Sequence, residues 1–524
     1  MLLLDPLITR STFKEEILHV LNKTILAILW GVKVLTHFYC STYSKDYIYK
    51  GLVLYNSLQK YDQDFHFFFI CVQDEVKNLL ENMELRNVTL ISMKDIENED
   101  WELANIRSTR NDKEYIWSSK ASIMLYLLNH FSELDHIIWL DGDTAFLSDT
   151  QPIFDEWGNF SIFLTEEQYK GKYKRLSKIY GVYNTGFMGF KRDQNAIHCL
   201  QWFREKLIEW CFDKPEKGRW SDQMYVNDWV TRFENVGVAG NIGINANLFI
   251  LRDRTVTADD DNLYINGDRL ILFHYYGFKY FNRNEFDLCA HGQSPKDEIV
   301  QWLFVPYIQA CNEVMDSISY IDRDFYQKQT PNGRFIMNYF NLASNINGNG
   351  DKFNFCTIIS ENGLSEGLDL YNSLRMHTNG FCLWICCLDD ITYNTLVNME
   401  LENVIVIDIK NIEDQKLLNV KDTRNASEYR LTIKAPLISY ILKNNYNIHY
   451  MIYTDPNARF VTNVTNAFYK WDKHPVFIWE KENDQNTQQD YGINMPSLIG
   501  FKRNKKAFKF LSAWRKKCIN GCYD

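Results

Sequence analysis

The sequence predicts an α/β protein built from two tandem copies of one domain. Short motifs recur at a nearly constant distance along the chain, and apolar strand-like runs alternate with helical patterns inside each copy. In addition, the aspartates Asp141 and Asp143 directly follow one of the apolar runs. The length agrees with this prediction, because 524 residues exceed one ordinary domain.

The internal repeat can be followed through most of the second half. "GLVLYNSL" at Gly51 returns as "GLDLYNSL" 316 positions later, and "NMELRNV" returns as "NMELENV" at the same separation. The separation is 314 for "TRNDKEY" and "TRNASEY", and 311 for "YGVYNTGFMGFKR" and "YGINMPSLIGFKR". The second copy therefore contains small deletions, and it ends before the last part of the first copy has a counterpart.

Within the first copy the elements alternate in order. Strands are predicted at "FHFFFICV", "NVTLISM", "HIIWLDGD" and "FSIFLT", and helices at residues 48–58 and 118–128. Continuous apolar strands separated by helices are typical of a parallel sheet covered on both faces. Ligands of such sheets bind at the carboxyl ends of the strands, where Asp141 and Asp143 lie.

Four segments follow from these patterns. Residues 1–33 form an N-terminal helical segment, residues 34–283 the first domain, residues 284–350 a helical region and linker, and residues 351–524 the incomplete second copy. The apolar run 25–34 is too short to span a membrane. We expect a buried helix there, with a peripheral membrane anchor as the alternative.

Composition narrows the class of function. The net charge of −10 gives no reason to expect nucleic acid as a partner, because nucleic-acid binding needs a basic surface. The 12 cysteines have no zinc-site spacing and are expected to be free thiols in a reducing compartment. No secretion signal is recognised at the start, so the expected location is the cytoplasm.

The acidic pair suggests a metal. Two carboxylates separated by Gly142 at a strand end can face one hard cation, and Mg²⁺ or Mn²⁺ prefers such oxygens together with substrate phosphates. An acidic loop without a metal is the alternative for this motif taken alone.

Four motifs in order resemble the GT-A glycosyltransferases: "WLDGD", "YNTGFMGF", "WSDQMYVND" and "LILFHYYGFK". The likeness, over about residues 36–283, is to the retaining group that includes lipopolysaccharide galactosyltransferases and glycogenin. It implies two tandem Rossmann-like nucleotide-diphospho-sugar transferase domains joined by a helical linker. It also implies a site for Mn²⁺ (or Mg²⁺), in which Asp143 and His274 are direct ligands and Asp141 contacts the ribose of the donor or the metal. Gly277 and Lys279 are implied at the donor phosphates.

The same resemblance assigns further residues. Asp222 and Gln223 are the implied catalytic pair beside the transferred sugar, although "SDQ" is also a plausible helix N-cap. Asn184 and Gly186 are expected next to the donor sugar, and Lys120 next to the donor phosphate. By position after the first strand, two residues are candidate contacts of the nucleotide base: Thr42 and Tyr47.

The second copy has lost part of this set. Asp143 corresponds to Asn457 and Gly142 to Pro456, and no counterpart of His274 exists. An amide binds a divalent cation less well than a carboxylate does, so we expect an inactive second copy. Three residues are nevertheless kept, which indicates that some members of the set are structural: Arg110 as Arg424, Glu114 as Glu428, and Lys120 as Lys434.

The predicted function is metal-dependent sugar transfer from a nucleotide-sugar, most simply a UDP-sugar, to a glycan or lipid-linked acceptor. We expect cell-envelope polysaccharide synthesis in the cytoplasm, with possible peripheral association at the inner face of the plasma membrane. The alternative is a catalytically inactive nucleotide-sugar or glycan binding protein. A nucleotidyltransferase is disfavoured, because "STYSKDYIYKG" lacks the glycine-rich, basic pattern that cradles a triphosphate.

Overall fold

The computed structural model describes residues 36–291, 294–326, 336–342, 353–378, 380–445, 448–461, 471, 474–479 and 498–521. The predicted N-terminal helix lies outside these residues. The chain divides into two compact units, Met1–His274 and Tyr275–Asp524. No helix in the described part of the chain is long and apolar enough to cross a membrane.

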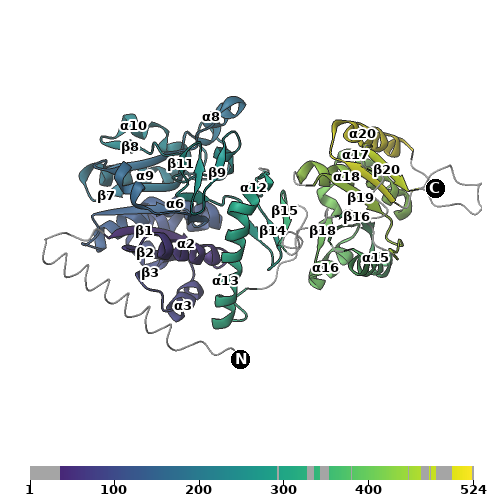
Figure 1. Ribbon diagram of the computed structural model, residues 1–524, viewed down its shortest axis with the longest axis horizontal. Coiled ribbons are helices and arrows are strands. Elements are labelled where there is room, and N and C mark those ends of the chain that lie inside the picture. Colours follow the sequence, from purple (N-terminus) through teal and green to yellow (C-terminus); the bar gives the residue numbers. More distant parts are fainter. Residues whose placement is uncertain are drawn as a thin grey trace, which may run out of the picture. The chain divides into compact units, whose positions relative to one another are not determined.

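The first unit is a seven-stranded sheet with helices on its faces (Figure 1). Its principal elements in chain order are β1 (His37–Tyr43), α2 (Ile48–Tyr61), β2 (Phe65–Cys71), α3 (Asp74–Asn82), β3 (Val88–Ser92), α4 (Met93–Glu99), α5 (Trp101–Ile106), α6 (Asp112–His130), β4 (His136–Leu140), β5 (Thr144–Phe146), α7 (Gln151–Trp157), β6 (Ile162–Glu166), α8 (Ser177–Tyr180), β7 (Tyr183–Lys191), α9 (Gln194–Glu209), α10 (Trp229–Arg232), β8 (Val236–Val238), α11 (Leu248–Leu251), β9 (Val256–Ala258), β10 (Leu263–Ile265), β11 (Asp268–Arg269) and β12 (Leu272–His274).

The first sheet has the strand order β3-β2-β1-β4-β7-β6-β8. Strands β1 to β4 are parallel as predicted, whereas β7 runs antiparallel to both of its neighbours. The sheet is therefore mixed, because β7 follows β6 as its antiparallel neighbour and lies between β6 and β4. This reversal places the start of β7 at the carboxyl end of β4, where the acidic pair lies.

The core of the first unit follows from the apolar pattern. Helices α6 and α9 pack together over one face of the sheet and bury Met124, Leu127, Leu200 and Phe203 against Phe38 and Trp139. Asn111 begins α6 with a reciprocal capping box to Glu114, which satisfies two backbone amides at the helix start.

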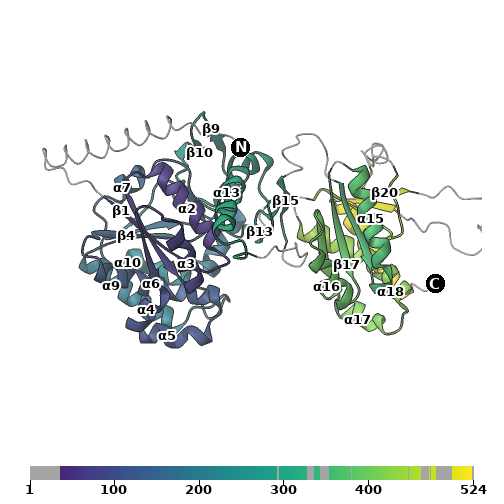
Figure 2. The ribbon, with the colours of Figure 1, turned by 90° about the horizontal axis from the view of Figure 1, so that it is seen from below.

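The second unit begins with a small sheet and a long helix and continues with a six-stranded sheet (Figure 2). Its elements are β13 (Lys279–Tyr280), β14 (Glu285–Asp287), α12 (Asp297–Ile299), α13 (Val305–Ile321), β15 (Tyr339–Asn341), β16 (Phe353–Ile359), α15 (Leu364–His377), β17 (Phe381–Cys387), α16 (Asp390–Met399), β18 (Val404–Asp408), α17 (Gln415–Lys421), α18 (Ala426–Asn444), β19 (Tyr450–Thr454), β20 (Val476–Trp479), β21 (Leu498–Lys502) and α20 (Lys505–Asn520).

The region 284–350, predicted as a helical region and linker, thus also contains β14 and β15, which pair with each other. The six-stranded sheet has the order β18-β17-β16-β19-β21-β20, which repeats the order of β3 to β6 in the first sheet. Alternate residues of β16 face two different core clusters, one with α18 and one with α15. Equal strand order is what a tandem duplication requires, and the common origin of the two copies stays a prediction.

Candidate active site

The candidate site lies at the carboxyl end of β4. The backbone amide of Asp141 donates to the carbonyl of Gly186 at 2.8 Å, because antiparallel β7 runs beside β4 at this edge. The backbone carbonyl of Asp141 accepts from the amide and hydroxyl of Thr144. The acidic pair is therefore held on a turn whose backbone groups are hydrogen bonded to two neighbouring segments.

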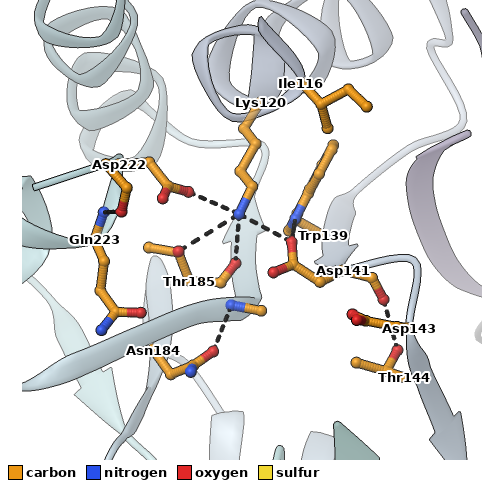
Figure 3. Close-up of polar contacts among 12 residues, drawn as sticks. Ile116, Lys120, Trp139, Asp141, Asp143, Thr144, Asn184, Thr185, Asp222 and Gln223 are labelled. Carbon is orange, nitrogen blue, oxygen red and sulfur yellow. Dashed lines mark hydrogen bonds and ion pairs between the residues drawn. The ribbon is translucent and has the colours of Figure 1, made fainter. Parts of the chain in front are cut away.

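Lys120 lies at the centre of this edge (Figure 3). Its Nζ is 2.9 Å from Oδ1 of Asp141 and 2.7 Å from Oδ2 of Asp222, and it donates to the carbonyl of Thr185 at 3.1 Å. Lys120 is fully buried. Burial alone would lower the pKa of its ammonium, but the two carboxylates outweigh burial and raise it above the usual range. One permanent cation therefore joins residues from α6, β4 and the loop after α9.

Asp222 does not act as the helix cap that was the alternative for "SDQ". It precedes the short 3₁₀ helix Gln223–Asp228, where its side chain makes no capping hydrogen bond, and Oγ of Ser221 accepts from the amide of Gln223 instead. The carboxylate of Asp222 is thus committed to Lys120. Asp141 has a second partner, since Nε1 of Trp139 donates to its Oδ1 at 2.9 Å.

His274 contacts the second aspartate of the pair. Strand β12 pairs antiparallel with β5 and sets His274 opposite Thr144, so that Nε2 of His274 lies 2.9 Å from Oδ1 of Asp143. Burial raises the pKa of Asp143, but His274 and Lys50 outweigh it and hold the pKa well below its usual range. For His274, burial lowers the pKa and Asp143 raises it, with a net rise. Both shifts favour the charged pair.

The predicted metal ligands are thus only partly gathered. Within the described ranges, no group of three or more His, Cys, Asp or Glu side chains is placed to hold a metal ion. Asp143 and His274 meet, whereas the carboxylate of Asp141 is bound by Lys120 and Trp139. One carboxylate and one imidazole suit Mn²⁺, and a cation at this pair would take further oxygen ligands from a substrate phosphate.

Lys50 is a site residue that sequence reasoning missed. Its Nζ lies 3.7 Å from Oδ2 of Asp143, and its side chain is 2% exposed. The ammonium also lies 4.4 Å from the centre of the Tyr47 ring. The repeat carried a signal that could have found it, because the matching position in the second copy is Glu366, a residue of opposite charge.

Asn184 belongs to a buried polar network. Its Nδ2 donates to Glu167 at 2.6 Å, and its Oδ1 accepts from the amide of Gly186 and from Nδ2 of Asn245. Asn247 also donates to Glu167, at 3.2 Å. Glu167, Asn245 and Asn247 were not predicted. Each lies in a loop or strand end with no motif, and only the fold brings them to Asn184.

Gly186 is packed tightly against the histidine. A Cβ added there would lie 2.7 Å from ring atoms Cε1 and Nδ1 of His274. Real side chains do not tolerate such a distance, so glycine is required for His274 to reach Asp143. The glycine expected to admit the donor sugar therefore makes room for a predicted metal ligand.

The remaining predicted residues are more dispersed. Gln223 uses its side-chain amide to donate to the carbonyl of Tyr180 at 2.7 Å, which ties it to the end of α8. Thr42 is buried within β1, whereas Tyr47 at the start of α2 is 47% exposed. Gly277 and Lys279 fall in the second unit, where Gly277 has a left-handed backbone (φ +78°) against the ring of His291.

The second unit keeps one part of this arrangement. Nζ of Lys434 lies 2.8 Å from Oδ1 of Asp455, and the hydroxyl of Tyr453 donates to the same oxygen at 3.0 Å. These three residues match Lys120, Asp141 and Trp139. Asn457, the counterpart of Asp143, is exposed.

The structural role predicted for part of the retained set is confirmed. Arg110 donates to the carbonyl of Ile208, and Arg424 donates to that of Ile519 at the matching position. Glu114 and Glu428 both complete capping boxes at the starts of α6 and α18. These residues join the long helix to the rest of each unit and lie outside the acidic edge.

Comparison with known proteins finds a family match within the first unit. Residues 39–227 match the family model described as Glycosyl transferase family 8. The first unit carries a family 8 glycosyltransferase domain. The match contains most of β1, Lys120, the acidic pair and the Asp222-Gln223 pair. The mixed α/β sheet of this unit is consistent with the GT-A fold predicted from the motifs.

Two uncharacterised proteins of Bacillus subtilis (strain 168) are similar in sequence to part of this chain. YfnF is 29% identical over 258 residues, which cover 48% of this chain and 84% of YfnF. YfnD is 27% identical over 292 residues, which cover 55% of this chain and 93% of YfnD.

Solved glycosyltransferase structures are also similar at low identity. The galactosyltransferase LgtC, in complex with donor and acceptor sugar analogues, is 13% identical with a TM-score of 0.36, over 53% of this chain and 96% of LgtC. The glycosyltransferase GlyE of Streptococcus pneumoniae TIGR4 is 12% identical with a TM-score of 0.32, over 82% of this chain and 94% of GlyE.

Proposed function

We propose that the first unit transfers a sugar from a nucleoside-diphosphate donor, most simply a UDP-sugar, to a hydroxyl of a glycan or lipid-linked acceptor. We further propose that the reaction uses Mn²⁺ or Mg²⁺ and retains the anomeric configuration of the donor. One observation carries the proposal. A family 8 domain holds a Lys120–Asp141–Asp222 cluster and an Asp143–His274 pair side by side at one sheet edge.

This arrangement suits the chemistry of sugar transfer. The bond between the anomeric carbon and the diphosphate oxygen breaks, a bond to the acceptor oxygen forms, and negative charge develops on the leaving diphosphate. Asp143 and His274 would hold the divalent metal, which supplies Lewis-acid stabilisation of that charge. The ammonium of Lys120 is held at the same edge between Asp141 and Asp222, so its position needs no reorganisation during the reaction.

The protein residues would mainly orient the sugar. The ion pair with Lys120 fixes the carboxylate of Asp222, and burial keeps water away from it. A carboxylate held in this way can accept hydrogen bonds from sugar hydroxyls without first losing side-chain freedom. The Asn184–Glu167–Asn245 network similarly fixes the strand β7 that carries Gly186.

For the second unit we propose a non-catalytic role, as a structural or acceptor-positioning half. The observation that supports it is the loss of charge at Asn457 next to the retained Lys434–Asp455 pair. The unit keeps a cation beside a carboxylate, but lacks the second carboxylate that meets His274 in the first unit.

The experiment measures release of UDP from a panel of UDP-sugars by the purified full chain, with Mn²⁺ present and then chelated. We expect release with at least one donor, and its loss on chelation. Equal rates after chelation would contradict the metal-dependent mechanism. Donor binding in calorimetry without release, for every donor and for added acceptors, would instead support the alternative of an inactive nucleotide-sugar binding protein.

A further inference from the structure

Lys50 occupies a position that is unfavourable for a lysine. It is the third residue of α2, so its ammonium lies near the positive end of the helix dipole, where acidic side chains are preferred. Its side chain is also buried, and a buried charge is costly unless an opposite charge compensates it. The residue therefore needs a compensating contact, and Asp143 supplies one at 3.7 Å.

In the second unit, the matching helix position is occupied by a residue that needs no compensating charge. Glu366 is the third residue of α15, and it is exposed and acidic in the first turn, as helix electrostatics favour. The second unit also has Asn457 in place of Asp143. Lys50, which the helix dipole disfavours, thus occurs in the unit that has Asp143. Glu366, which the helix dipole favours, occurs in the unit that has Asn457 instead.

We propose that Lys50 is a positioning residue that makes metal binding at Asp143 and His274 depend on the donor diphosphate. This inference rests on the proposed function. The ammonium neutralises Asp143 and repels a divalent cation, so the protein alone presents one compensated carboxylate and one imidazole. A diphosphate supplies the negative charge and the oxygen ligands that the protein alone lacks. The metal ion and the diphosphate therefore bind tightly only together.

The contacts at the carboxyl end of β4 agree with a site in which lysines compensate both aspartates. Asp141, which would otherwise supply a second free carboxylate, is neutralised by Lys120. No three-ligand metal group is found in the described part of the chain. Each carboxylate of the acidic pair therefore contacts a buried lysine: Lys50 from α2 contacts Asp143, and Lys120 from α6 contacts Asp141 and is shared with Asp222.

Coupling between two ligands is reciprocal, so it can be measured from either side. In the wild-type full chain, Mn²⁺ is titrated alone and followed by the electron paramagnetic resonance of free Mn²⁺. UDP is titrated by calorimetry without metal and at a fixed Mn²⁺ concentration. We expect weak binding of each alone and strong mutual enhancement.

In Lys50→Met, which removes the charge and keeps an unbranched side chain only one atom shorter, Mn²⁺ alone should bind about tenfold more tightly or better. The enhancement of UDP binding by Mn²⁺ should fall by a similar factor, and Lys50→Arg should restore it. Lys60→Met serves as the matched control, because Lys60 is exposed on the same helix. It should change neither quantity.

Circular dichroism checks the fold, and Lys50→Gln, which makes the same charge change with a polar side chain, replaces Lys50→Met if that variant does not fold. Unchanged or weaker Mn²⁺ binding in the charge-neutral variant, or unchanged coupling, overturns the role of Lys50. If wild type binds no Mn²⁺ with or without UDP, the proposed metal site itself fails. The two failures are therefore distinguishable.

Discussion

The two units share a scaffold and differ at one edge of it. In both, a tryptophan covers a glycine of the antiparallel strand, so that an added Cβ would lie 3.0 Å from Trp157 at Gly189 and 2.5 Å from Trp471 at Gly500. Both units also keep the arginine contact to the backbone and the capping box of the long helix.

One difference lies in residues that would meet a ligand. The first unit has Asp143 with Lys50, and the second has Asn457 with Glu366. The Lys–Asp–aromatic cluster persists in both units. Packing contacts are thus independent of the acidic site, which indicates that the site can be lost without loss of the fold. The following substitutions test this separation, from the largest expected effect to the smallest.

Asp143→Asn makes the first unit resemble the second at the acidic edge. We expect metal-dependent release of UDP to fall by about 1000-fold, because a metal contributes several kcal/mol to the stabilisation of a leaving group. The rate is measured at fixed donor and Mn²⁺ concentrations. The control is Asp149→Asn, an exposed carboxylate near the same strand. A rate within a few fold of wild type would remove Asp143 from the site.

Lys120→Met should destabilise the first unit by about 3–5 kcal/mol, because it leaves the buried Asp222 without its partner cation. Lys434→Met should cost the second unit only about 1 kcal/mol, because Asp455 is 27% exposed and keeps the hydroxyl of Tyr453. Calorimetric melting of each variant against wild type provides the comparison. Equal losses of stability in the two variants would show that the Lys–Asp–aromatic cluster stabilises both units to the same extent.

Asp62 is a buried carboxylate of the first unit whose counterpart in the second unit is Thr378. Burial raises its pKa, but hydrogen bonds from His37, Tyr39 and Thr150 outweigh burial, and the net pKa is lowered. A lowered carboxylate pKa contributes stability that is present above the unfolded pKa and is lost as the pH falls.

We therefore expect Asp62→Asn to cost about 1–3 kcal/mol at pH 7. The difference from wild type should shrink as the pH falls below about 4, the usual carboxyl range. Denaturant unfolding across this pH range measures it. If the difference in unfolding free energy between wild type and Asp62→Asn stays constant down to pH 3, the variant is destabilised by lost packing and not by lost charge.

Asn457→Asp should have the smallest effect. It restores one carboxylate in the second unit, but this unit has Glu366 in place of the lysine that contacts Asp143 in the first unit. Calorimetry should find one Mn²⁺-dependent UDP site per chain in both wild type and the variant. A second site in the variant would mean that Asn457 alone separates the two units.

The sequence determined the repeat, the alternation of strands and helices, and the position of the acidic pair at a strand end. The alternation and the acidic pair are local features, because the spacing of apolar residues and the carboxylates at a strand end can be read from a short stretch of sequence. The motif order also placed His274 and Asp222 among the candidates, and the structure brings them to Asp143 and Lys120. The antiparallel direction of β7 was not predicted, because an apolar run predicts a strand but not whether that strand pairs parallel or antiparallel with its neighbours.

Only the tertiary structure decided which charges neutralise each other. Lys50 and Asp143 are 93 positions apart, and they meet because the start of α2 and the end of β4 share one edge of the sheet. Likewise the pairing of β5 with β12 brings His274 within 2.9 Å of Asp143. Residue type fixes the charge of a side chain, but its partner depends on packing between segments far apart in the chain. For that reason the sequence predicted the acidic site, and the fold decided its charge balance.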